Sequence, residues 1–123
     1  MAILAKILVG LVAVEHIYIL WLEMFGWTTR GPKVFRSIPR DLFEPTKALA
    51  ANQGLYNGFL AAGLIWSLLI SNPEWSANVA IFFLGCVSIA GTFGAITAEQ
   101  RSIFYIQAVP AILALIVTLI AGM

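Results

Sequence analysis

The sequence predicts an all-α integral membrane protein, a four-helix up-and-down bundle that forms one membrane domain over residues 1–123. Hydrophobic residues make up 61% of the chain and charged residues only 11%, whereas soluble domains are nearer ~45–50% apolar and ~25% charged. The hydrophobic residues also fall into four runs, each about the ~20 residues that a helix needs to cross the hydrocarbon core. Because a water-soluble domain of this length could not cover so much apolar surface with polar groups, we expect a bilayer around the helices.

The first helix is expected over residues 2–25. Lys6 and the apolar run after it resemble the start of a secretory signal peptide. Glu15 and His16 interrupt that run, however, and no small-residue cleavage site follows. We therefore expect this helix to be retained as a membrane span.

A polar loop over residues 26–45 separates the first helix from the rest, because glycine, prolines and most of the charged residues gather there. Short helical turns are expected near residues 34–35 and 42–43. The remaining helices are expected over residues 46–70, 74–98 and 103–121, with Asn72 or Ser71 capping the third and Pro110 tolerated inside the fourth. Their short connections make consecutive helices antiparallel neighbours.

Lysine and arginine placement predicts the orientation. The loop and the turn before the fourth helix share one side of the membrane and carry most of the positive residues, while the other side has Lys6 alone. By the positive-inside rule, we expect a bacterial inner (plasma) membrane protein with both termini outside and loop 26–45 in the cytoplasm.

A polar cluster inside the helices is the candidate site. Glu15, His16 and Glu23 share about one 100° arc of the first helix, since consecutive residues are ~100° apart. Polar side chains of the other three helices fall in the same leaflet as Glu23. The predicted catalytic residues are Glu15, His16 and Glu23, and the predicted ligand-binding residues are Asn52, Gln53, Tyr56, Asn57, Glu99 and Gln107. Together they predict a pocket that opens toward the cytoplasm, with Glu15 and His16 as its floor.

Two interpretations of this cluster stay open. Ionisable groups at membrane depth are costly and usually functional, which favours a site for a ligand, a proton or a reaction. The same residues could instead form an interhelical hydrogen-bond network that fixes helix register. No metal site is expected, because one histidine with scattered carboxylates is a weak ligand set, and no cofactor-binding motif occurs. Cys86 has no partner for an intrachain disulfide.

Two strings carry a resemblance to a known family. They are Glu-His-x-Tyr-x-x-x-x-Glu-Met-Phe, which begins at Glu15, and Asn-Gln-Gly-x-Tyr-Asn-Gly, which begins at Asn52. The chain resembles, over nearly its whole length, DUF1304, a domain-of-unknown-function family of short four-helix membrane proteins of bacteria. The resemblance implies the fold and the membrane location, and it implies no activity.

Three functions are compatible with these residues. The first is a pocket for a small lipophilic molecule, on which Glu15, His16 and Glu23 would act by proton transfer. The second is a small transporter or proton-coupled subunit, and the third is a structural or accessory scaffold. The expected partners are membrane lipid, such a ligand, and further copies of the chain through the glycine-rich faces of the second and third helices; the net charge of +1 gives no basic face for nucleic acid.

Overall fold

The computed structural model describes residues 2–121, and every long element in that range is helical. In chain order the elements are α1 (Ile3–Met24), α2 (Gly31–Val34), η1 (Arg40–Leu42), α3 (Lys47–Leu69), α4 (Pro73–Thr97), α5 (Arg101–Ile103), η2 (Phe104–Ala108) and α6 (Val109–Ala121). No strand occurs between residues 2 and 121. The all-α class is therefore confirmed, and the predicted helix ends lie within about two residues of the observed ones.

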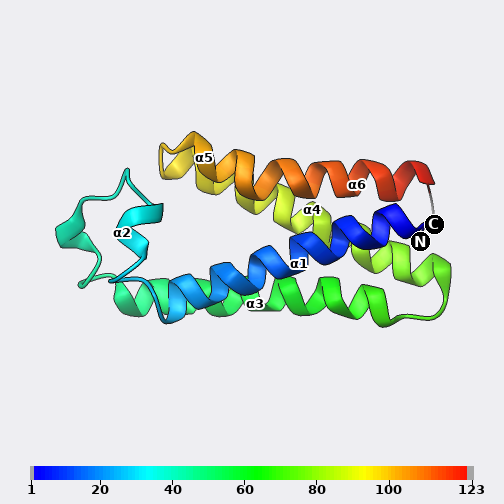
Figure 1. The fold of residues 1–123 in the computed structure, drawn as a ribbon, viewed down its shortest axis with the longest axis horizontal. Helices are drawn as coiled ribbons and strands as arrows, with labels where there is room; N and C mark the ends of the chain where they lie inside the picture. Colours follow the sequence, from blue (N-terminus) through cyan, green and yellow to red (C-terminus); the bar gives the residue numbers. More distant parts are fainter. Residues whose placement is uncertain (1, 122–123) are drawn as a thin grey trace.

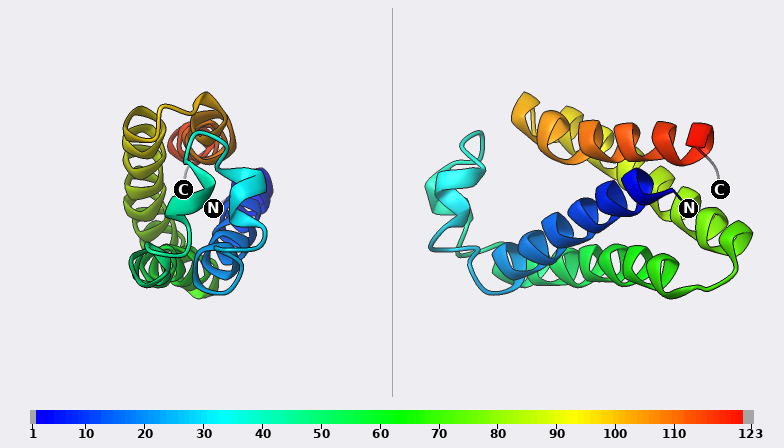
Figure 2. Two further views of the ribbon diagram at one scale, coloured as in Figure 1. Left: turned by 90° about the vertical axis from the view of Figure 1, so that its left-hand side faces the viewer. Right: turned by 45° about the vertical axis from the view of Figure 1, so that its right-hand side comes forward.

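Four long helical segments run antiparallel to their neighbours: α1, α3, α4 and the continuous rod α5–η2–α6 (Figure 1). Contacts join α1 to α3, α3 to α4, α4 to α6 and α6 to α1. The pairs α1–α3 and α4–α6 lie close at the end that holds both chain termini. They diverge toward the other end, where the segment between α1 and α3 lies (Figures 1 and 2).

The aliphatic core fills the half of the bundle nearer the chain termini. Fully buried side chains from all four segments meet there, among them Val9, Leu64, Leu84 and Ala111. Small residues such as Ala80 and Ala114 allow the helices to approach one another. The polar half and the apolar half of the molecule are thus separated along its length.

The outer surface of the helices is apolar. Large hydrophobic side chains are exposed along α1, α3, α4 and α6, including Ile120 at 80% and Ile89 at 73% exposure. Soluble monomers rarely expose continuous apolar surface of this extent. α1, α4 and the rod Arg101–Ala121 are long and apolar enough to cross a membrane, which is compatible with a multi-pass membrane protein.

α3 differs from the other three segments. It has 23 residues and is therefore as long as they are, but it is not among the helices that meet the apolar criterion for a span. The polar residues of its first half, including Asn52, Gln53 and Asn57, lower its hydropathy. The expected fourth span thus remains a prediction, which the length of α3 and its packing along α1 support.

Glycines on α3 allow its close approach to α1. A Cβ atom at Gly54 would lie 2.8 Å from Met24 Cγ, 3.0 Å from Glu23 Cβ and 3.1 Å from the Leu20 carbonyl oxygen. A Cβ at Gly58 would lie 2.5 Å from Leu20 Cδ1. These two glycines serve packing within one chain. A homo-oligomer stays a prediction, and among the predicted small residues Gly85 of α4 has open space beside it.

The helix ends follow local rules. The Asn72 side chain accepts a hydrogen bond from the Trp75 backbone N–H at 3.1 Å, which confirms the predicted cap, and Pro73 occupies the first turn of α4 rather than the turn before it. At the other end of α4, Glu99 has φ of 54°. The Gln100 and Glu99 N–H groups bond the Ala95 and Ile96 carbonyls, which is the Schellman pattern that usually places glycine at this position.

Candidate functional site

A cavity of about 370 Å³ lies between the diverging ends of the helices. Small-molecule pockets usually measure ~300–1,000 Å³. All four long segments and the connecting loop contribute to its wall, which is lined by Glu23, Trp27, Phe35, Ile38, Leu42, Thr46, Leu49, Ala50, Gln53, Asn57, Ala90, Gly94, Thr97, Ala98, Ile103 and Gln107. The sequence predicted a polar pocket in this half of the bundle, and four of its nine proposed residues line this cavity.

Glu23 and Asn57 form the polar centre of the wall. The Asn57 side-chain amide donates a hydrogen bond of 2.6 Å to Glu23 Oε1. Glu23 is only 7% exposed, although it carries a carboxyl group. The close packing of Gly54 on α1 brings the two helices near enough for this contact. A buried carboxyl group is costly unless it is hydrogen-bonded, so Asn57 stabilises Glu23 in place.

Gln107 reaches the cavity from an irregular part of the fourth segment. Residues 104–108 form a π-helical turn directly before Pro110. Proline cannot donate to the carbonyl four residues earlier, and a wider turn accommodates that loss. Single π-turns are frequent at functional sites. Beside the cavity, Gly91 lets α4 pack directly against this turn, because a Cβ there would lie 2.9 Å from the Ala108 nitrogen.

The segment between α1 and α3 covers the end of the cavity. It is folded rather than extended, since the rings of Trp27, Phe35 and Phe43 pack with centroid distances of 5.4 Å and 4.8 Å. Phe43 is 2% exposed, and Trp27 Nε1 donates to Thr46 Oγ1 at 3.0 Å. Figure 2 shows this segment lying across the open end of the four helices. We call residues 25–46 the lid.

Hydrogen bonds tie the lid to both helix pairs. Gln100 Nε2 donates to the Val34 carbonyl at 2.9 Å, and Gln100 Oε1 accepts from the Ser37 N–H and hydroxyl at 3.3 Å each. On the α1 side, Arg30 Nε donates to the Tyr18 hydroxyl. Gln100 thus connects the lid to the α4–α5 turn, and the lid lies over the end of the cavity at which the sequence predicts an opening.

Glu15 and His16 lie apart from the cavity wall. His16 is 1% exposed, and its Nδ1 lies 2.9 Å from the Val12 carbonyl oxygen, to which it donates as the Nδ1–H tautomer. Glu15 Oε1 lies 3.9 Å from His16 Nδ1 and is buried without a hydrogen-bond partner. Neither residue lines the cavity. The position of His16 in the helix packing favours the network interpretation, and a catalytic role for the pair stays a prediction.

Asn52 and Tyr56 also lie outside the cavity wall. Asn52 is exposed and donates to the Ala48 carbonyl of its own helix at 3.3 Å. Tyr56 is 61% exposed and packs beside Phe59. Both belong to the polar arc of α3 that the sequence indicates, but Gln53 and Asn57 are the members of that arc that reach the cavity.

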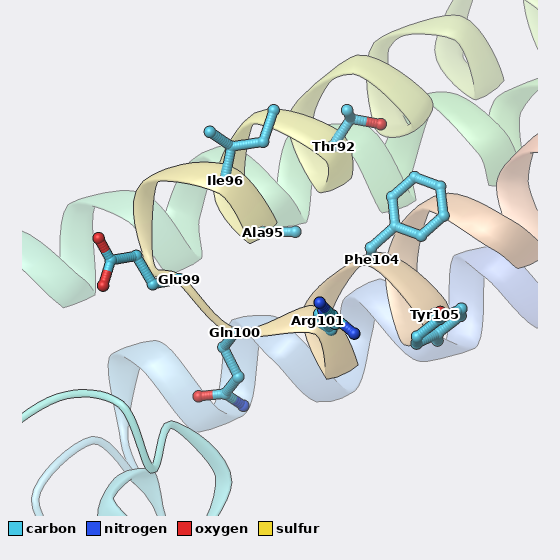
Figure 3. Close-up of a pocket in the computed structure, with 8 residues that line it drawn as sticks. All are labelled: Thr92, Ala95, Ile96, Glu99, Gln100, Arg101, Phe104 and Tyr105. Carbon is cyan, nitrogen blue, oxygen red and sulfur yellow. The ribbon is translucent and has the colours of Figure 1, made fainter.

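Glu99 lies in a second, exterior groove of about 500 Å³. Figure 3 shows its carboxylate directed away from the Gln100 side chain, which turns toward the lid. The groove also includes Ile96 and Tyr105, which are 69% and 63% exposed. Glu99 and Gln107 are eight residues apart, and the α4–α5 turn places them on different surfaces.

The sequence did not identify the lid as part of the site. The available signal for a folded segment was its three aromatic residues Trp27, Phe35 and Phe43, which are spaced eight residues apart. A tryptophan just past the end of a membrane span, as Trp27 is, usually indicates an interface anchor, whereas Trp27 lines the cavity. Thr46 and Thr97 were missed as well: Thr46 precedes α3, where an N-cap is the usual expectation, and Thr97 is the last residue of α4.

The cavity can hold a molecule that is mostly apolar and carries hydrogen-bonding groups. Aromatic and aliphatic side chains form much of the wall, and Glu23, Gln53, Asn57 and Gln107 supply a carboxyl and amides. Among residues 2–121, no group of three His, Cys, Asp or Glu side chains is placed to hold a metal ion. Glu23 is the ionisable side chain of the wall, so proton exchange with a bound molecule would use this residue.

Comparison with known proteins finds one family of unknown function. A family profile described as "Protein of unknown function (DUF1304)" matches residues 10–119. The chain is 33% identical over 118 residues to "Uncharacterized protein YpaA" of Lactococcus lactis subsp. lactis strain IL1403, an alignment that covers 94% of this chain and 97% of the relative. No solved structure matches the chain.

Proposed function

The chain belongs to the DUF1304 family, and we propose that it is a membrane protein that binds a small, partly lipophilic molecule in the cavity between its diverging helices. The observation that carries this proposal is the Glu23–Asn57 pair. The residue Glu23 is only 7% exposed, and an amide holds its carboxyl group at 2.6 Å on the wall of a cavity of about 370 Å³. Packing alone would not require an ionisable group here, because an amide could make the same hydrogen bond.

The membrane placement is part of the proposal. Six of the seven Lys and Arg residues lie in or beside the lid and the α4–α5 turn, and all six are exposed: Arg30, Lys33, Arg36, Arg40, Lys47 and Arg101. The opposite end has Lys6. The positive-inside rule then places the lid in the cytoplasm and both termini outside, with α3 crossing as the fourth span of a bacterial inner (plasma) membrane.

Binding fits the geometry better than transport by a single chain. Fully buried aliphatic side chains of all four segments fill the half of the bundle beyond the cavity, among them Val9, Leu64 and Leu84. A substrate path through that half would have to displace this packing. A transporting homo-oligomer or a scaffold would leave the cavity without a retained ligand, and these alternatives therefore differ from binding in one measurable property.

That property is ligand retention during purification. The protein is extracted in a mild detergent, and the small molecules bound to it are identified by mass spectrometry. Ala98→Phe places a ring in the cavity, whereas Ala95→Phe makes the same change on the same helix in the exterior groove. We expect a compound that wild type and Ala95→Phe retain and that Ala98→Phe loses by about tenfold or more. Equal retention by all three, or no compound with any, would contradict a binding function.

A further inference from the structure

The cavity wall has an exposed side and a buried side. Four of the seven lining residues on α3 and α4 are exposed: Leu49 at 69%, together with Gln53, Ala90 and Thr97. On the opposite side, Glu23 of α1 and Ile103 of α5 are buried. The cavity is therefore accessible between the N-terminal half of α3 and the C-terminal half of α4. These halves diverge toward the lid end of the bundle (Figures 1 and 2).

The route toward water is covered by contrast. The packed rings of Trp27, Phe35 and Phe43 and the hydrogen bonds of Gln100 hold the lid over that end. Five lid residues line the cavity, of which Trp27, Phe35, Ile38 and Thr46 are half-buried and Leu42 is 45% exposed. The surfaces of α3 and α4 beside the gap carry exposed apolar side chains such as Leu49 and Phe93, which face lipid in a bilayer. The accessible side of the cavity therefore meets the hydrocarbon.

The charge of the wall selects among amphiphiles. Glu23 is the one acidic side chain among the lining residues, and none of them is Lys or Arg. Arg30, Lys33, Arg36 and Arg40 are all exposed on the outer side of the lid. A phosphate or carboxylate head would meet a carboxyl group without a compensating cation, which is unfavourable in a site of low polarity. A hydroxyl or amine can donate to Glu23 instead.

We propose that the cavity takes its ligand sideways from the surrounding leaflet, through the α3–α4 gap, and that this ligand is an amphiphile with a neutral or cationic hydrogen-bond-donating head, an alcohol or an amine. This inference rests on the proposed binding function. The head lies at Glu23 and Asn57, and the amides of Gln53 and Gln107 flank it. The hydrocarbon tail passes Leu49 and Ala90 into the lipid. The lid then keeps water from the head group, and the ligand does not enter past it.

The fluorescence of Trp27, on the cavity wall, can report the binding of a ligand in the cavity. Trp21, Trp66 and Trp75 are exposed and are replaced by Phe, so that Trp27 is the sole tryptophan. The protein is reconstituted in phosphatidylcholine vesicles and titrated at neutral pH with three probes of one chain length: bromododecylamine, bromododecanol and bromododecanoate. Bromine quenches tryptophan fluorescence on contact. A matched protein with Trp75 as its sole tryptophan reports the concentration of each probe in the bilayer.

The titration distinguishes an error in the proposed ligand class from an error in the proposed binding function. We expect the amine and the alcohol to quench Trp27 saturably, at bilayer concentrations about tenfold lower than the acid requires, and we expect Glu23→Gln to remove most of the preference for the amine. If the acid quenches Trp27 at the same concentration as the amine, the ligand class is wrong although the cavity binds amphiphiles. If no probe quenches Trp27 more than it quenches the Trp75 reference, the binding function itself is refuted.

The route is tested by the rate at which quenching begins. Ala90→Phe narrows the α3–α4 gap, and Ala95→Phe is its control on the exterior groove. Gln100→Ala loosens the lid. Lateral access predicts that Ala90→Phe slows quenching about tenfold while Ala95→Phe and Gln100→Ala leave the rate unchanged. Access past the lid predicts the reverse, an accelerated rate with Gln100→Ala and no effect of Ala90→Phe, and this result would overturn the lateral route.

Discussion

The hydrogen bond between Asn57 and Glu23 makes a quantitative prediction about stability. A double-mutant cycle uses Asn57→Ala and Glu23→Met, each of which removes one partner without supplying a replacement donor or acceptor. The bond is 2.6 Å long, and its acceptor is the carboxyl group of Glu23, a residue that is 7% exposed. Hydrogen bonds to charged groups contribute ~1.5–3 kcal/mol in soluble proteins, whereas interhelical bonds in membranes average ~0.6 and reach ~1.7 kcal/mol.

We therefore expect a coupling free energy of about 1–2 kcal/mol, near the upper end of the membrane range. It is measured by reversible unfolding with dodecyl sulfate in mixed micelles, followed by circular dichroism. Asn52→Ala supplies the matched control, because Asn52 is exposed and bonds only within its own helix at Ala48. Its cycle with Glu23→Met should be additive within ~0.3–0.5 kcal/mol. A Glu23–Asn57 coupling no larger than that of the control would refute the pairing on which the site is built.

Three further predictions concern packing, a helix end and topology. Gly54→Ala should destabilise the protein by about 1–3 kcal/mol, because its Cβ would lie 3.1 Å or less from atoms of α1; Gly85→Ala, which meets nothing within 4 Å, should be neutral or stabilise α4 by up to ~1 kcal/mol in the same unfolding assay. Glu99→Gly should raise the free energy of unfolding by about 1 kcal/mol, because Glu99 has φ of 54°, which glycine adopts without strain. A loss of ligand retention with this variant would instead show that Glu99 takes part in binding. In a chain whose native cysteine is replaced, Asn72→Cys should react with a membrane-impermeant reagent in intact cells and Asp41→Cys should react only after lysis, and the opposite pattern would invert the topology.

The helices could be predicted from the sequence because their signals are local. Run length, the prolines and the amide cap at Asn72 each act within a few residues, and the observed ends agree within about two positions. The polar arc of α3 was predictable for the same reason, since helical periodicity alone puts Gln53 and Asn57 on one side. Periodicity could not show whether all of the arc faces the cavity. Gln53 and Asn57 line it, whereas Asn52 and Tyr56 do not.

The membership of the site was harder to predict because it depends on long-range geometry. His16 and Glu23 are seven residues apart and nearly eclipsed on α1, yet one belongs to the packed core and the other to the cavity. What separates them is the divergence of the helix pairs, which no periodicity encodes. Glu99 was assigned by depth alone, and the left-handed backbone at that residue turns its side chain to the exterior groove.

The sequence by itself determined that this protein is helical, apolar enough for a bilayer, and polar in one half, because composition and periodicity are properties of the chain. Only the tertiary structure decided which polar groups meet. Gly54 brings α1 against α3 and pairs Glu23 with Asn57, while the π-turn before Pro110 turns Gln107 toward them. Gln100 binds the segment that the sequence predicts as a polar loop and holds it in place as the lid. Such contacts join residues tens of positions apart, and their energy depends on helix separation and tilt rather than on any local pattern.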